Sequence, residues 1–182
     1  MAKPSPADYP ATSGNTTSTP AMTQTLDPAS SQTRPDEPEF EPVERIEGSA
    51  GSHLLFLCDH ASNALPPGYG TLGMDASQFE RHIAFDPGAA AVTRALASHF
   101  NAPAVLARFS RLLIDPNRGE DDPTLVMRLY DGTVVPANRG ITRDGIAERL
   151  ERLYRPYHAA YARLAAAHAK LLEEEFKPAT TG

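Results

Sequence analysis

The first residues that could do chemistry lie around His60, directly after a short apolar run. The run covers residues 53–58 and ends in a polar segment that holds Asp59, His60 and Asn63. A histidine at the end of a buried strand can bind a metal ion while a neighbouring carboxylate fixes its tautomer. The same polar residues can instead cap a tight turn after the strand. The sequence leaves both interpretations open.

A second group of such residues surrounds the short apolar run 112–114. Arg111 precedes this run, and Asp115 and Arg118 follow it. Two arginines beside a buried strand are costly unless they meet anions, and a guanidinium group matches a carboxylate with two parallel hydrogen bonds. The pattern predicts a subsite for a substrate carboxylate. The alternative is a solvated network in which both arginines pair with Asp115 and the acidic residues 120–122.

Further titratable side chains lie between these two groups. On a helix, His82 would lie beside Phe79 and Ile83, which is typical of a hydrogen-bonded histidine in a core. Asp86 stands directly before Pro87, where it can cap the start of a helix.

Three short apolar segments are predicted to be strands: 53–58, 104–107 and 112–114. Continuous apolar runs of this length are typical of strands that are buried on both faces of a parallel sheet. In open α/β sheets, ligands bind outside the carboxyl ends of the strands. Because Asp59 and Asp115 follow two of these segments, both polar groups stand where a site would form.

Helices are predicted between and after these strands. Asp75 can cap a first helix. A second helix over 88–100 would bury Val92, Leu96 and Phe100, which recur every four residues.

A long final helix is predicted from about residue 142 to residue 176, because apolar side chains recur along one face. Pro156 should kink this helix or mark a boundary between two helices. Before the helix, the segment 131–133 predicts a turn into a short strand or loop.

Composition and charge exclude several classes of protein. The chain has 182 residues and a formal net charge of −6, the wrong sign for binding nucleic acid or an anionic membrane through its overall field. No apolar run approaches the roughly 20 residues that a membrane span needs. The single cysteine, Cys58, excludes an internal disulfide and a thiolate metal cluster. A cytoplasmic protein is expected.

The chain divides into two parts by composition. Residues 1–45 are rich in Ser, Thr and Pro and are predicted to be a disordered tail, since they cannot bury enough apolar surface to offset the entropy of ordering. Residues 46–178 are predicted to form one domain. The sequence contains no phosphate-binding glycine loop with lysine, no Gly-x-Ser-x-Gly elbow and no His-Glu-x-x-His motif.

Four segments taken together resemble the N-formylglutamate amidohydrolase family. They are CDHASN at 58–63, RHIAFDPGA at 81–89, SRLLIDPNR at 110–118 and DGT at 131–133. The resemblance implies an α/β fold with a mixed, mainly parallel sheet flanked by helices, of the phosphorylase/hydrolase-like type. It also implies hydrolysis of N-formyl-L-glutamate, or a related N-acyl amino acid, to formate and L-glutamate, a step of histidine degradation.

The resemblance implies zinc or another divalent metal as cofactor, with His60 as the first metal ligand. The wider fold commonly has a glutamate three positions after that histidine, where this sequence has Asn63. An amide oxygen is a weaker zinc ligand than a carboxylate, so Asn63 is expected to contact substrate instead. The ligand set in this chain is therefore incomplete.

The resemblance also assigns residues to the substrate, a small N-acyl amino acid that carries a carboxylate. Arg111 would polarise the scissile carbonyl, and Asn117 with Arg118 would hold the carboxylate. Three further residues of the motifs receive no assigned role: His82, Asp86 and Asp115.

Members of the family continue beyond the long helix with further strands, whereas this sequence ends at Gly182. The expectation is an incomplete family domain whose uncovered edge associates with a second copy or with a partner. The function open beside hydrolysis is a catalytically silent carboxylate-binding module, or a fragment that lacks the second half of the active site.

Overall fold

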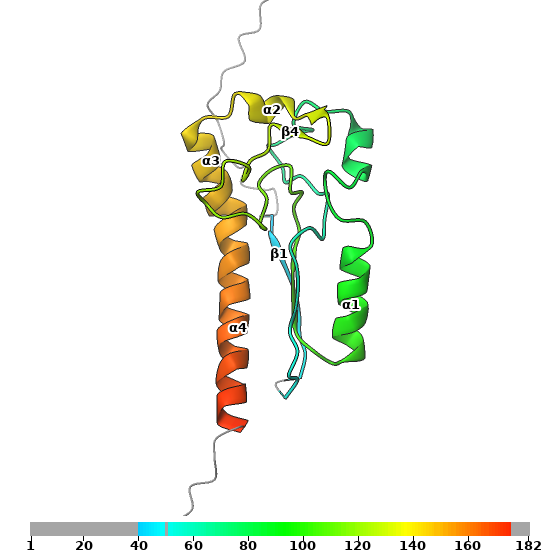
Figure 1. The fold of residues 1–182 in the computed structure, drawn as a ribbon, viewed down its shortest axis with the longest axis vertical. Coiled ribbons are helices and arrows are strands. Elements are labelled where there is room, and N and C mark those ends of the chain that lie inside the picture. The colour runs from blue at the N-terminus through cyan, green and yellow to red at the C-terminus, as the bar shows by residue number, and fades with distance from the viewer. Residues whose placement is uncertain (1–39, 50, 176–182) are drawn as a thin grey trace, which may run out of the picture. The chain divides into compact units, whose positions relative to one another are not determined.

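The computed structural model describes residues 40–49 and 51–175 (Figure 1). The predicted tail up to residue 39 and the predicted domain end at residue 178 lie outside these residues. The described part contains a three-stranded sheet in the order β1-β3-β2. Its strands are β1 (Val43–Ile46), β2 (Phe56–Cys58) and β3 (Ala104–Ala107).

Strand β3 forms the centre of this sheet and is buried along its whole length. Its bounds are those that the apolar run 104–107 predicts. The side chains alternate between the two faces, as in any strand. Val105 and Ala107 belong to the larger hydrophobic core on one side, and Ala104 and Leu106 belong to a smaller core on the other.

The sheet is mixed, as predicted. Strand β2 runs parallel to β3, with Phe56 opposite Ala104, and β1 runs antiparallel to it, with Val43 opposite Ala107. Among the described residues, β2 with β3 is the one parallel pairing, so a mainly parallel sheet is not confirmed.

Two helices cover opposite sides of this sheet (Figure 1). Helix α1 (Ala89–His99) packs on β2 and β3, and helix α4 (Arg155–Glu175) packs on β3 and β1. The α4 side contains the larger core, where Leu153, Tyr157 and Ala160 are buried.

Helix α1 lies where the sequence predicts it, but it buries a different face. Thr93 and Ala97 are its buried residues, whereas Val92, Leu96 and Phe100 are exposed at 57%, 37% and 47%. The prediction that this apolar stripe is buried is wrong, because small side chains let the helix approach the sheet closely. The predicted cap is also wrong. Gly88 precedes the helix at φ 88°, a left-handed conformation that favours glycine.

The predicted final helix is divided into segments. Thr142 caps α3 (Arg143–Arg149) through its side chain, and a π-helical stretch, η2 (Leu150–Tyr154), joins α3 to α4. Pro156 is the second residue of α4. The wider π-helical turn accommodates a proline that has no N–H to donate, so the predicted boundary at Pro156 is confirmed.

The remaining elements are short. Asp75 caps the 3₁₀ helix η1 (Ala76–Glu80) by accepting from the Ser77 amide, as predicted. Strands β4 (Leu129–Tyr130) and β5 (Thr133–Val134) form a hairpin, followed by α2 (Pro136–Arg139). The hairpin turn has positive φ at Asp131 (45°) and Gly132 (72°), which confirms the turn predicted at 131–133.

Three other predictions need correction. The first predicted strand shortens to β2, and the run 112–114 forms a buried turn instead of a strand. The boundary predicted at residue 45 falls inside β1. Val43 is only 2% exposed, so the described fold begins before this boundary. Hydrogen bonds to β3 and burial of Val43 in the core stabilise β1, although its own sequence does not predict a strand. Within residues 40–49 and 51–175, each helix lacks the length or the apolar character that a membrane crossing requires.

Candidate active site

His60 lies in the loop that leaves β2, two residues after the strand ends at Cys58. It is buried, at 6% exposure. Its carbonyl oxygen accepts a hydrogen bond of 3.0 Å from the Asp86 amide. This bond joins the loop after β2 to the segment that leads into α1, so both segments deliver side chains to one place.

The segment that carries Arg111 and Asp115 is a tight turn packed in the core. The Ser110 amide donates to the Ala64 carbonyl at 2.8 Å, and the Ser110 hydroxyl donates to the Ala84 carbonyl at 2.9 Å. At the other end, the Asp115 amide donates to the Leu125 carbonyl at 2.8 Å. A buried turn needs such partners for each backbone group, and here they hold Arg111 and Asp115 beside His60.

Two residues that the sequence did not single out complete this support. The Asn138 amide group donates to the carbonyls of Leu112 and Met127 at 2.8 and 2.7 Å. Arg149 donates to the Leu113 carbonyl at 2.6 Å and to the Asn138 side-chain oxygen at 2.8 Å. Both side chains are buried. The signal available in the sequence was the position of Arg149 on the apolar side of the predicted final helix.

Asp115 is the centre of the cluster, and its side chain is fully buried. Its Oδ1 atom accepts from His60 Nε2 at 2.6 Å and from the Asn117 amide at 3.0 Å. Its Oδ2 atom accepts from Arg111 Nη2 at 2.7 Å. A buried carboxylate is tolerated because these three donors replace water.

Arg111 is held on several sides. Its Nη1 atom lies 3.5 Å from Asp86 Oδ1, and its guanidinium group lies over the Tyr130 ring at 5.0 Å from the ring centre. Its Nε atom is buried and has no hydrogen-bond partner. Arg111 therefore keeps one unused donor beside one long hydrogen bond.

Asp86 is the member of the cluster that faces solvent. Its Oδ2 atom lies 3.3 Å from His60 Nδ1, and its side chain is 53% exposed. His60 thus lies between a buried carboxylate, Asp115, and a solvent-facing one, Asp86.

The surroundings shift the pKa values of His60 and Asp115 in opposite directions. Burial works against a charged His60, but the hydrogen bond and the charge of Asp115 outweigh it, so the pKa of His60 is raised. Burial alone would raise the pKa of Asp115, and the hydrogen bond and positive charge of His60 outweigh it, so the pKa of Asp115 is lowered. Both shifts favour a charged pair.

Comparison with known proteins identifies the family. The family model described as N-formylglutamate amidohydrolase matches residues 52–175, which contain all of this cluster. The chain belongs to the N-formylglutamate amidohydrolase family. Among proteins with curated functions, no match to the chain was found.

Two solved structures support the fold of this family member. A crystal structure of a gene product from Agrobacterium tumefaciens has 34% identity and a TM-score of 0.69, over 72% of this chain and 52% of that chain. A crystal structure of N-formylglutamate amidohydrolase from Ralstonia eutropha JMP134 has 23% identity and a TM-score of 0.52, over 75% of this chain and 54% of that chain. The chain thus spans about half the length of both.

The side chains of the other residues that the family motifs single out lie apart from the cluster. Asn117 and Arg118 are exposed, and Arg118 reaches Asp122 only at 4.0 Å. Asn63 donates to the Phe79 carbonyl at 2.9 Å, which is a structural contact. His82 is exposed and lies 3.5 Å from Asp131, so its interpretation as a core histidine is wrong. The chain leaves helical structure after Glu80, which turns His82 outward.

A second pair beside the family cluster was not predicted. Tyr157 from α4 donates to Asp59 Oδ1 at 2.6 Å. Burial, together with the Asp59 carboxylate, raises the pKa of Tyr157, so it stays a hydrogen-bond donor. This bond fastens the loop that carries His60 to α4. The periodicity of the final helix predicts that Tyr157 is buried, but not which partner it has.

The side chains of the cluster do not make a metal site by themselves. Both ring nitrogens of His60 face carboxylates. Within the described ranges, no group of three or more His, Cys, Asp or Glu side chains is arranged to hold a metal ion. The described residues by themselves therefore do not supply a complete ligand set for the zinc centre that the resemblance implies.

Proposed function

We propose that this chain takes part in hydrolysis of the amide bond of a small N-acyl amino acid that carries a carboxylate, with N-formyl-L-glutamate as the favoured substrate. Membership of the family supports this proposal. The observation that carries it is the arrangement of His60 and Arg111 against one solvent-facing carboxylate, Asp86. Acid, base and cationic groups then meet at one accessible point.

In this proposal Arg111 stabilises the carbonyl oxygen of the scissile amide. Its contact with Asp86, at 3.5 Å, is the longest of its hydrogen bonds and is the one that a substrate oxygen could replace. Asp115 holds the opposite edge of the guanidinium group in place. A preorganised donor of this kind contributes roughly 3 kcal/mol to the stabilisation of a developing oxyanion.

Asp86 and His60 supply the proton transfers. Water adds to the formyl carbon and gives one proton to Asp86, and the amine nitrogen takes one proton from His60 as the carbon–nitrogen bond breaks. The proton on Asp86 then returns to His60 Nδ1, 3.3 Å away, so formic acid, which ionises to formate in solution, and the free amine leave an unchanged site. The raised pKa of His60 suits it to hold that proton near neutral pH.

Asn117 and Arg118 are proposed to hold the substrate carboxylate. The Asn117 amide is already fixed by Asp115 at 3.0 Å, so the segment is anchored to the cluster while both side chains face solvent. Among the described residues, the acidic partner of Arg118 is Asp122 at 4.0 Å, so its guanidinium group is open to a stronger anion.

The test is formate release from N-formyl-L-glutamate by the purified full chain, with and without added zinc. Under the proposal, His60→Ala and Arg111→Gln lose turnover by a factor of a hundred or more, and Arg118→Ala mainly raises KM. The matched controls are His99→Ala and Arg139→Ala, which change exposed residues outside the cluster. Equal loss in the control variants, or no effect of His60→Ala, would contradict the assigned roles.

Zinc binding stays a prediction and is checked in the same series. A calorimetric titration with zinc is made on the wild type and on His60→Ala. Stoichiometric binding that His60→Ala removes would support the metal role given by the resemblance. Binding that the substitution leaves unchanged would contradict it.

One observation favours a second candidate, a carboxylate-binding module without turnover. Asp115 already satisfies both His60 and Arg111, so the cluster is complete as an internal ion-pair network. For this candidate, N-formyl-L-glutamate raises the Tm of the wild type but not of Arg118→Ala, and no formate appears. Formate release by the wild type would contradict it.

A further inference from the structure

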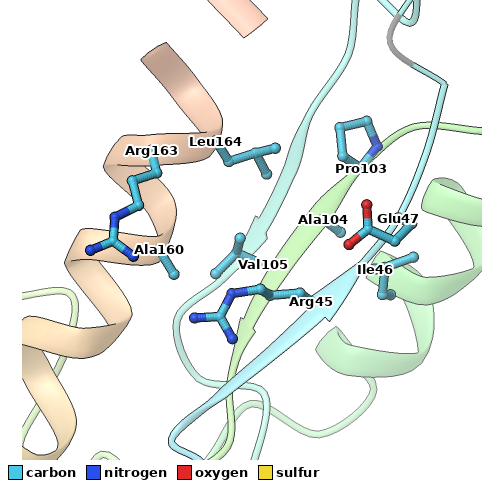
Figure 2. Close-up of a pocket in the computed structure, with 9 residues that line it drawn as sticks. All are labelled: Arg45, Ile46, Glu47, Pro103, Ala104, Val105, Ala160, Arg163 and Leu164. Carbon is cyan, nitrogen blue, oxygen red and sulfur yellow. The ribbon is translucent and has the colours of Figure 1, made fainter. Parts of the chain in front are cut away.

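A pocket of about 280 Å³ lies between α4 and the sheet, away from the His60 cluster (Figure 2). It opens beside the first residues of β3, whereas His60 follows the carboxyl end of β2. Because β2 and β3 are parallel, the pocket and the cluster stand at opposite ends of these strands. The pocket is lined by Arg45, Ile46, Glu47, Pro103, Ala104, Val105, Ala160, Arg163 and Leu164.

The body of the pocket is apolar. Val105 on β3 and Ala160 on α4 point toward each other across it (Figure 2). Both belong to the larger hydrophobic core and are 2% and 6% exposed, so they form the floor of the pocket, and the partly exposed Pro103 and Leu164 form its accessible apolar wall. At about 30 Å³ for each water-sized group, the volume has room for about nine such groups.

Two arginines stand at the mouth of the pocket. Arg45 comes from β1 and Arg163 from α4, and Figure 2 shows both guanidinium groups on the same side of Val105. Within the described part of the chain, Arg163 has no acidic partner, and Arg45 has only an exposed contact with Glu41 at 3.5 Å. An anion placed between them would therefore not compete with a strong ion pair.

Glu47 limits the charge that the pocket accepts. It lies on the other side of the pocket from the arginines (Figure 2), and no positively charged partner is found for it among the described residues. Its carboxylate would repel a molecule that carries negative charge at both ends. The lining thus suits one anionic group joined to an apolar body.

We propose that this pocket binds an amphipathic organic monocarboxylate of about eight carbon atoms, with its carboxylate held by Arg45 and Arg163. The hydrocarbon chain lies against Pro103 and Leu164, above the floor that Val105 and Ala160 form. This site is separate from the proposed catalytic cluster and does not depend on the proposed hydrolysis. Its ligand differs from the proposed substrate, which has a polar acyl amino acid body.

The experiment is a calorimetric titration of the full chain with sodium octanoate. Octanol is the comparison that keeps the apolar body without the charge, and acetate keeps the charge without the body. The expected result is saturable binding of one octanoate, with binding of octanol and acetate at least tenfold weaker. Equal binding of octanol and octanoate would overturn the role of the arginines.

The variants separate this site from general surface effects. Arg163→Gln and Arg45→Gln are expected to weaken octanoate binding at least tenfold, and Ala160→Leu to abolish it by filling the pocket. Arg139→Gln, an exposed arginine on α2, is the matched control and should bind as the wild type does. Since Ala160→Leu can disturb the core, the arginine variants decide the outcome. Unchanged octanoate binding in both arginine variants would overturn the proposal.

Discussion

At the scale of single residues, the contact between Asp115 and His60 determines the local chemistry. The carboxylate is fully buried and accepts from His60 at 2.6 Å and from Arg111 at 2.7 Å. Water cannot replace this carboxylate as the partner of His60 or Arg111, since both of these side chains are less than 10% exposed. The cluster is therefore one unit in which each member depends on the others.

Replacing Asp115 by Asn is expected to destabilise the fold by about 3–5 kcal/mol, because it leaves two buried cations without their shared anion. Urea unfolding followed by circular dichroism measures the change. Asp121→Asn, which changes an exposed acid nearby, is the control and should stay within about 0.5 kcal/mol of the wild type. A loss below about 1 kcal/mol for Asp115→Asn would show that the cluster is solvated.

The pH dependence of stability follows from the same pair. The pKa of His60 is raised above its ordinary value of 6.5, so the stability it contributes is complete below pH 6.5 and is lost as pH rises through the folded-state pKa. The pKa of Asp115 is lowered below 3.8, so its contribution is present above pH 3.8 and is lost as pH falls through the folded-state pKa. The pair stabilises the fold most between these two values.

The free energy of unfolding of the wild type should therefore fall more steeply than that of Asp115→Asn as the pH rises above 6.5. The measurement is urea unfolding at several pH values in buffer with a chelator, so that bound metal does not contribute. Parallel pH profiles for the two proteins would refute this origin of the pH dependence.

At the scale of elements, helix α1 buries a face of small side chains, and its apolar stripe is exposed instead. Thr93 and Ala97 contact the sheet side, and Val92 is 57% exposed. Close approach needs small side chains, and Ala97, at 1% exposure, has no room for a larger one.

Val92→Gln should thus change the free energy of unfolding by less than about 0.5 kcal/mol. Ala97→Leu should destabilise the fold by about 1–3 kcal/mol through overpacking against the sheet. Both are measured by urea unfolding at low protein concentration. The reverse order of the two effects would mean that α1 is rotated relative to the structure described here.

At the scale of the whole molecule, apolar surface is exposed beside an edge strand. Within the part of the chain that the structure describes, strand β2 is an edge of the sheet, and Leu57 on this strand is 37% exposed. Phe56 on β2 contacts Phe100 after α1, with ring centres 6.2 Å apart, so the α1 stripe continues onto the edge. Edges and apolar patches of this kind favour association.

The full chain is expected to self-associate as its concentration rises, and Leu57→Lys is expected to reduce this association. Light scattering over a range of concentrations gives the mass. Leu129→Lys, at a leucine that is 61% exposed on the separate hairpin, is the matched control and should not alter association. A wild type that stays monomeric throughout would contradict the prediction.

The family and several local elements could be predicted from the sequence alone. The four motifs identified the family, which the match over residues 52–175 confirms. Strand β3, the cap at Asp75, the turn at 131–133 and the boundary at Pro156 followed from local rules. Such features depend on residues within a few positions of one another, so a linear pattern contains them.

Tertiary structure decided which candidate residues meet. His60, Asp86, Arg111 and Asp115 come from three separate segments, and only the fold brings them into hydrogen-bond contact. The run 112–114 reads as a strand by its apolarity, but it becomes a turn because Asn138 and Arg149 satisfy its carbonyls from distant positions. Burial and partners of this kind depend on contacts between segments far apart in the chain, which no periodicity records.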